Sequence, residues 1–299
     1  MAATYPAPTR VEPSRSGGGL SYRNRLLLQR IAIYVVLIFF ALLFLMPMFW
    51  MLSTSFKPKR EWFSGDLRWI PNTITSENYT KILNNPTLPV GRWFINSIGV
   101  GLVVTGLTLL INAMAAYAYA RMQFPGRKVL FGLLLATLFL PGVMFLVPNF
   151  LTVYRLNLLN NYLGVILPGL AGVFGVFFLR QFFETIPKEL EEAAQIDGAS
   201  PAVTFFRVAL PLAKPAMATL GIITFLASWN DFLWPLLILK DRKLQTLPPG
   251  LSSLKGAYTS EYGQMMAGAV IAAVPVLILY VVLQKFIVQS VATSGLAGQ

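Results

Sequence analysis

Residues 31–56 read IAIYVVLIFFALLFLMPMFWMLSTSF and contain no Asp, Glu, Lys or Arg. The hydrocarbon core of a bilayer is about 30 Å thick, and a helix needs about 20 apolar residues to cross it. The stretch is too long for a secretory signal, whose apolar region has roughly 7 to 15 residues and ends at a small-residue cleavage pattern. Residues 31–56 therefore predict a transmembrane helix.

Five further apolar runs follow along the chain. Four of them contain no charged residue, and the run at 215–239 is interrupted only by Asp231. Such runs are too long and continuous for barrel strands, and a helix satisfies its own backbone groups in hydrocarbon. The sequence predicts an all-α integral membrane protein with six transmembrane helices within residues 23–289, at 31–56, 93–120, 129–154, 156–179, 215–239 and 262–284. Small residues in the runs, such as Ala113 and Ala116, predict close helix packing.

The composition excludes most enzyme chemistry. Hydrophobic residues make up 56% of the chain, and it has no Cys and no His, which excludes disulfides, thiol nucleophiles and histidine general bases. No cluster of paired acids supports a membrane-embedded enzyme. The net charge of +12 comes from short basic clusters between the apolar runs, so lipid head groups are a better match than nucleic acid.

The placement of Lys and Arg favours a cytosolic location for both chain ends, because the N-terminal tail and the connection after the second span are basic. Residues 57–92 argue against this topology, since they hold six positive residues and would lie outside. Residues 1–22 are rich in Pro, Ser and Gly and predict a disordered cytosolic tail. All six indoles fall at or beyond the predicted outer ends, where the membrane interface favours them: Trp50, Trp62, Trp69, Trp93, Trp229 and Trp234.

The loop at 184–211 concentrates five of the twelve acidic residues within fourteen positions. Pro187 suits the first turn of a helix and Gly198 a left-handed end, while Ser200 and Pro201 suit the start of a second helix. The loop therefore predicts two short helices outside the bilayer. It is either a solvated acidic loop or a docking element. In the second case, one helix face with Leu190, Ala193 and Ala194 would seat in a partner's groove.

The sequence of this loop resembles a known family. Residues 192–199 read EAAQIDGA and are followed by Phe206, Leu210-Pro211 and Pro215. This pattern is similar to the EAA loop of permease subunits in binding-protein-dependent ABC importers. The resemblance extends along most of the chain from about residue 30. Asn96-Ser97 and the stretches 115–118 (AAYA), 124–126 (FPG), 228–232 (SWNDF) and 247–248 (LP) resemble the carbohydrate-uptake class, in particular the smaller, six-span permease of maltose-type importers.

The resemblance implies a non-catalytic permease subunit of an ATP-driven importer, forming half of the translocation path for a sugar or sugar derivative. It implies an ATPase-coupling element made of Glu192, Ala193, Ala194, Asp197, Gly198, Leu190 and Pro211. The phosphate-cradling Walker pattern is absent from the whole sequence, so ATP and Mg are expected on a partner ATPase and no cofactor in this chain.

The implied partners are a second homologous permease, two copies of a cytosolic ABC ATPase and an extracytoplasmic sugar-binding protein. Residues 57–92 and 240–261 are the expected surfaces for that binding protein. The implied location is a bacterial or archaeal cytoplasmic (inner) membrane. The C-terminal tail at 290–299 departs from the family's glycine-rich tail, because it lacks the common terminal lysine.

Asp231 is a functional candidate, because a charge at the centre of a span costs about 2.5 to 3.5 kcal/mol. Lys214 lies 17 residues earlier, about 25 Å along a helix, which predicts that Asp231 lies near the outer edge of the bilayer. Together with Trp229 and Asn230 it forms a candidate substrate path, since sugars need hydrogen-bond partners and flat apolar faces. The alternatives are an interface anchor or a helix contact.

A second functional class is an ion-coupled secondary transporter. Such a protein needs intramembrane acids or histidines to relay its coupling ion. Only Asp231 qualifies, so the sequence favours the ATP-driven permease. Nothing in the sequence names the transported sugar.

Overall fold

The computed structural model describes residues 22–62, 68–257 and 261–296, and all regular elements in these ranges are helical. The chain is therefore an all-α membrane protein, as predicted. The expected tail at 1–22 lies outside the described residues except for Tyr22. Of the expected C-terminal tail, residues up to Leu296 belong to the last helix. The chain divides into two compact units, residues 1–50 and 51–299, which are described separately.

Within the described residues, three helices are long and apolar enough to cross a membrane without a break, and three bent helix pairs would bring the number of spans to six. The three unbroken helices are α1 (Tyr22–Ser55), α3 (Val90–Arg121) and α14 (Tyr262–Leu296). In the first unit, the apolar side chains of α1 are exposed, with Phe44 at 71%. A helix that shows apolar side chains on all sides suits a lipid environment.

The apolar run at 129–154 does not form one straight helix. Its first arm is α4 (Arg127–Ala136) continued by η2 (Thr137–Phe139), and its second is η3 (Gly142–Phe145) continued by α5 (Leu146–Arg155). The two arms meet at 100°. Pro141 is the physical reason: it has no backbone N–H and it disfavours the helical conformation in Leu140, whose φ of −84° and ψ of 127° are extended.

The next apolar run, at 156–179, is also broken. It opens on a loop in which Asn157 and Asn160 both have a φ of 55°. Asn161 then caps α6 (Tyr162–Ile166) by accepting a hydrogen bond from the backbone N–H of Leu163. After η4 (Leu167–Gly169), the chain bends by 48° into α7 (Val173–Thr185), which continues beyond the predicted end of the span.

The run at 215–239 contains α11 (Lys214–Trp229) and α12 (Leu233–Ile238), and Asp231 lies in the break between them. On its other side, α11 follows a chain of short helical segments from which it is bent by 77°. These segments are α9 (Pro201–Thr204), the π-helical turn η5 (Phe205–Ala209) and α10 (Leu210–Leu212).

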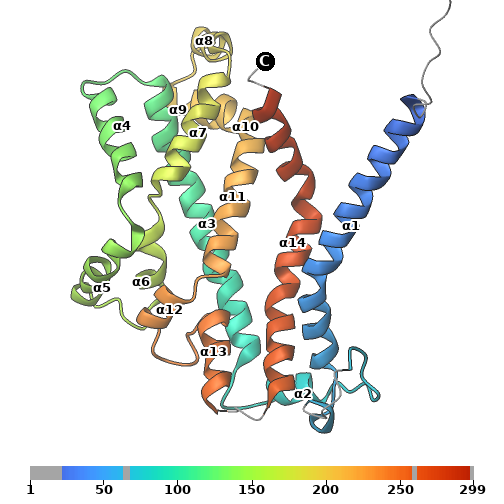
Figure 1. Ribbon diagram of the computed structural model, residues 1–299. Coiled ribbons are helices and arrows are strands. Elements are labelled where there is room, and N and C mark those ends of the chain that lie inside the picture. The colour runs from blue at the N-terminus through green and yellow to red at the C-terminus, as the bar shows by residue number, and fades with distance from the viewer. Residues whose placement is uncertain (1–21, 63–67, 258–260, 297–299) are drawn as a thin grey trace, which may run out of the picture. The chain divides into compact units, whose positions relative to one another are not determined.

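Helix α3 forms the centre of the second unit and packs against both α7 and α11 (Figure 1). Ala113 and Ala116 are fully buried in this core beside Val176 and Leu179 of α7. Their small side chains allow the close helix approach that the sequence predicted.

The second unit has two distinct ends (Figure 1). At one end, here called the α8 end, lies α8 (Lys188–Ile196); at the other, the α13 end, lie α2 (Glu77–Leu83), α12 and α13 (Leu247–Ala257). The remaining short element, η1 (Lys59–Glu61), precedes α2.

Two indoles predicted at the lipid interface are buried inside the protein instead. Trp93 is 0% and Trp229 is 2% exposed. The indole nitrogen of Trp93 donates to the carbonyl oxygen of Arg242 at 2.6 Å, and that of Trp229 to Ala272 at 3.2 Å. The interface prediction was therefore wrong for these two residues, because protein carbonyls rather than water satisfy their N–H groups.

Gly250 of α13 lies directly against the indole of Trp93, where an added Cβ would overlap the ring. The ring cannot move aside, because it is fully buried and hydrogen-bonded. We therefore expect Gly250→Ala to lower the free energy of unfolding by about 1 to 3 kcal/mol. The melting temperature of the detergent-purified protein measures this effect.

The matched control is Gly99→Ala on α3, because a Cβ there meets nothing within 4 Å. Alanine favours a helix by about 1 kcal/mol over glycine, so this variant should be neutral or stabilising. Equal melting temperatures for the two variants would contradict the packing of Trp93 on α13.

Candidate functional site

The acidic loop folds as the sequence predicted. Helix α8 begins directly after Pro187 and ends at Ile196, two residues before Gly198, which has a φ of +82°. The N–H of Gly198 donates to the carbonyl oxygen of Gln195 at 3.0 Å, and that of Ala199 to Ala194 at 2.9 Å. This left-handed end leaves α8 a compact helix with a defined exit direction.

A second short element follows at once. The hydroxyl oxygen of Ser200 accepts a hydrogen bond from the N–H of Val203, and Pro201 is the first residue of α9. Phe205 then inserts into the core, with its ring centroid 5.0 Å from Tyr117 and 6.4 Å from Phe183. The loop is thus anchored to both α3 and α7.

Apolar side chains remain uncovered on the outer side of this element. Leu190 is 46%, Phe206 51% and Ile196 87% exposed. Of the predicted coupling residues, Ala194 is half-buried and the others are exposed: Leu190, Glu192, Ala193, Asp197, Gly198 and Pro211. These residues therefore lie at the surface of the α8 end, Pro211 on α10 and the others on α8 and the turn that follows it. We call this surface, with Phe206 and Ile196, the α8 surface.

One acid of the loop is buried, and its role was not predicted. Glu191 is 6% exposed and forms an ion pair with Arg121, the last residue of α3, at 2.8 Å. The Tyr117 hydroxyl donates to the second carboxylate oxygen at 3.0 Å, and Arg121 also donates to the backbone oxygen of Ile186. No spacing signal links residues this far apart in the chain, so the sequence showed Glu191 only as one acid among several.

The Arg121–Glu191 pair joins α8 to the end of α3. Both side chains are 8% exposed. Removal of one partner of a buried pair leaves an uncompensated charge and costs about 3 to 5 kcal/mol. We therefore expect Arg121→Ala to lower the melting temperature strongly and to release α8, which limited proteolysis of the loop measures.

The control is Lys81→Ala on α2, because the Lys81–Glu77 ion pair is exposed, at 49% and 55%. Exposed pairs contribute about 0 to 1 kcal/mol, so this variant should hardly change the melting temperature. A similar loss in both variants would show that α8 does not depend on its buried pair.

A cavity of about 320 Å³ lies beside α11. Its polar lining consists of Asn149, Thr224, Ser228, Asp231 and Trp234. A carboxylate oxygen of Asp231 accepts from the backbone N–H of Trp234 at 3.3 Å, which holds the start of α12. The Trp234 indole nitrogen donates to the carbonyl oxygen of Gly164 at 3.2 Å.

The structure brings only one of the three predicted substrate-path residues to this cavity. Trp229 points away from it into the core, where it packs between Phe94 and Phe225. Asn230 is exposed and donates to the carbonyl oxygen of Leu226 at 2.9 Å. The four polar lining residues other than Asp231 were not predicted at a site, because they come from two apolar runs that are far apart in the sequence.

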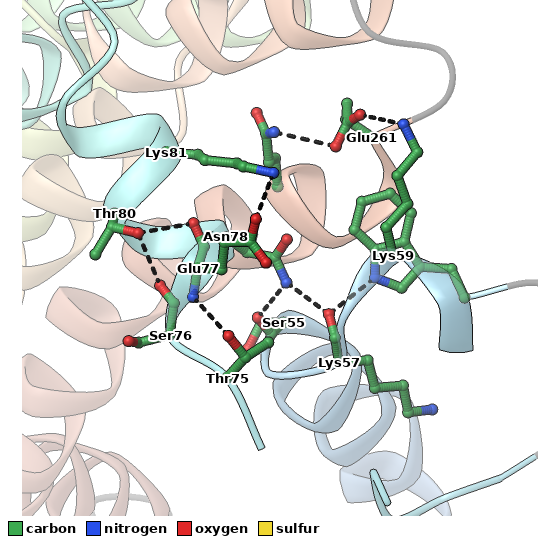
Figure 2. Close-up of polar contacts among 12 residues, drawn as sticks. Ser55, Lys57, Lys59, Thr75, Ser76, Glu77, Asn78, Thr80, Lys81 and Glu261 are labelled. Carbon is green, nitrogen blue, oxygen red and sulfur yellow. Dashed lines mark hydrogen bonds and ion pairs between the residues drawn. The ribbon is translucent and has the colours of Figure 1, made fainter. Parts of the chain in front are cut away.

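At the α13 end, residues 53–62 and 68–81 contribute to a polar cap, part of which is shown in Figure 2. The amide nitrogen of Asn78 donates to the carbonyl oxygens of Ser55 at 2.8 Å and Lys57 at 2.9 Å. Lys59 forms an ion pair with Glu261, just before α14, at 2.5 Å. Burial lowers the pKa of Lys57, whose ammonium donates to the backbone oxygen of Arg68 at 2.6 Å.

The other segment at this end, residues 240–257, is attached to α3. The amide nitrogen of Asn96 donates to the carbonyl oxygens of Lys243 at 3.0 Å and Gln245 at 2.9 Å. The Ser97 hydroxyl oxygen accepts from the N–H of Leu247 at 2.7 Å. The two segments expected to receive a binding protein therefore form one end of the same bundle.

A bundle of apolar helices with a polar cavity and an exposed helical element at one end suits a membrane transport protein. Residues 109–293 match the family described as binding-protein-dependent transport system inner membrane component. The chain belongs to this family. It is therefore an inner-membrane transport component, in agreement with the resemblance seen in the sequence.

Similar proteins and structures cover most of the chain. It is 36% identical over 271 residues to the arabinooligosaccharides transport system permease protein AraQ of Bacillus subtilis (strain 168), covering 90% of this chain and 96% of AraQ. It is 36% identical to the diacetylchitobiose uptake system permease protein NgcG of Streptomyces coelicolor, covering 87% and 86%. A chain of a bacterial ABC transporter for import of the acidic polysaccharide alginate superposes with a TM-score of 0.77, at 26% identity and 90% and 99% coverage.

Proposed function

We propose that this chain is a permease subunit of an ATP-driven ABC importer and forms half of the translocation path for a sugar or sugar derivative. The family assignment and the relatives named for arabinooligosaccharides and diacetylchitobiose support the cargo class. The polar cavity beside α11 supports a path for hydroxyl-rich solutes.

The α8 surface is the observation that carries the ATP-driven mechanism. It presents exposed Leu190 and Ile196 on α8, which Glu191 attaches to α3, and exposed Phe206 on the nearby turn η5. An exposed apolar face with a firm connection to a span suits the docking and force transmission that a coupling helix needs. In this proposal, ATP and Mg are bound by two copies of a cytosolic ATPase that dock on this surface.

The proposal also orients the chain. The α8 end faces the cytosol, with both chain termini on that side, in the cytoplasmic membrane of a bacterium or archaeon. The α13 end faces outward, and its cap and the segment at 240–257 receive the sugar-binding protein. A second homologous permease completes the path.

Coupling is tested with variants of the α8 surface. Glu192→Lys reverses an exposed charge. Gly198→Trp adds a bulky side chain at a position with a left-handed backbone conformation, which residues other than glycine rarely adopt. We expect both variant proteins to insert normally into the membrane. We expect them to lose sugar uptake by about tenfold or more and to release the ATPase during purification. The reason is that a docking contact weakened by about 1.4 kcal/mol loses tenfold in affinity. Uptake into proteoliposomes and ATPase co-purification measure the two effects.

Gly126→Trp is the matched control. Gly126 has a similar φ of +79° and precedes α4 in the connection after Arg121, but it is not part of the α8 surface. It should keep the ATPase bound and retain uptake. Normal transport by Glu192→Lys and Gly198→Trp would refute docking at α8, and uptake driven by an ion gradient without ATP would favour a secondary transporter.

A further inference from the structure

The cavity beside α11 has the hydrogen-bonding chemistry of a polyhydroxyl site. Within the described residues, the side chains of Asn149, Thr224 and Ser228 line it without making hydrogen bonds of their own. An amide and two hydroxyls both donate and accept, as sugar hydroxyls do. Gly169 and the half-buried Trp234 add small and flat apolar surface.

The ionisable lining of this cavity is acidic and carries no basic residue among the described residues. Asp231 is the only ionisable residue in its lining, and among the described residues its carboxyl accepts only the backbone N–H of Trp234. No Lys or Arg lines the cavity within the part of the chain that the structure describes. Proteins bind carboxylate, phosphate and sulfonate groups mainly through such cations.

The repulsion is large enough to discriminate between solutes. A negative group held about 6 Å from Asp231, at an effective dielectric constant of about 20, is disfavoured by a factor on the order of 100. The similar alginate importer handles an acidic polysaccharide, so the shared fold does not itself impose this selectivity. A selectivity of this kind would therefore depend on side chains such as Asp231.

We propose that this cavity is an anion-excluding sugar site: it admits uncharged polyhydroxyl compounds and rejects solutes that carry a carboxylate, phosphate or sulfonate. The proposal rests on the proposed function, import of a sugar, and narrows its substrate class to neutral saccharides. Asp231 acts here as a specificity-determining residue.

The absence of cysteine from the sequence allows a test that needs no known substrate. Ser228→Cys places one thiol in the cavity of the assembled complex, and Thr224→Cys is the second position. Each is labelled in vesicles with two methanethiosulfonates of similar size, one carrying a trimethylammonium group and one a sulfonate. Mass spectrometry of this subunit gives both labelling rates.

For each cysteine variant, the labelling rate with the cationic reagent is divided by the labelling rate with the anionic reagent. This ratio is then normalised to the same ratio at Thr87→Cys, an exposed position before α3. We expect a normalised ratio of about ten or more at Ser228→Cys, from the Asp231 charge. The additional change Asp231→Asn should return the ratio to within about twofold of the control, because it removes the charge and keeps the size.

Three outcomes would overturn the proposal. A normalised ratio near one shows that the cavity has no charge preference. A high ratio that survives Asp231→Asn shows that Asp231 does not set it. Failure of both cysteines to react with either reagent shows that solutes do not enter the cavity.

Transport supplies the second arm, with the complete importer in proteoliposomes. We expect uptake within a panel of uncharged arabinotriose, trehalose and diacetylchitobiose, and none of sn-glycerol 3-phosphate or oligouronates. Preferred uptake of an anionic compound refutes the neutral-substrate inference while leaving the importer function intact. A complex that transports no sugar but keeps the Asp231-dependent labelling ratio refutes the proposed function and leaves the anion exclusion standing.

Discussion

The buried ion pair between Arg121 and Glu191 is the contact on which the rest of this structure depends. It joins the last residue of the central helix α3 to α8, and the Tyr117 hydroxyl completes its hydrogen bonding. A buried pair adds little net stability compared with apolar residues, but it tolerates few geometries. Its main effect is therefore to set the position of α8 relative to α3.

The same helix holds the opposite end of the bundle. Near its start, Trp93, Asn96 and Ser97 bind the backbone of residues 242–247, and Trp93 supports α13. Between these two ends, α3 packs closely on α7 and α11 through small residues. One continuous helix, α3, therefore connects α8 with the α13 end. In the proposed function, this helix is the physical link between the two sides of the membrane.

The cavity beside α11 shows why chain breaks matter in a membrane protein. Asp231 lies between two helices, so its carboxyl can hold the free N–H of Trp234 and still face the cavity. Irregular backbone at membrane depth is tolerated where it lines such a polar space. Two other broken apolar runs also contribute to the lining. The run that bends at Pro141 contributes through α5, and the run that bends before Val173 contributes through η4.

Local patterns were sufficient for the features that depend on neighbouring residues. The length of the apolar runs predicted an all-α membrane protein, and Gly198, Ser200 and Pro201 predicted the helix ends of the acidic loop, because capping acts within a few residues. The EAAQIDGA stretch pointed to the family. Even the break at Pro141 follows from a local rule, but a prediction based only on the length of the apolar run did not include it.

The remaining features depend on pairs of residues that are distant in the sequence. The pairing of Glu191 with Arg121, the burial of Trp93 and Trp229, and the cavity residues from α5, α11 and α12 arise only when helices pack. Composition sets which side chains avoid water, but only the packing of helices decides whether an indole meets lipid or protein. The sequence by itself therefore determined the apolar helices and the helix ends of the acidic loop, and the tertiary structure decided which charges are buried together and what lines the cavity.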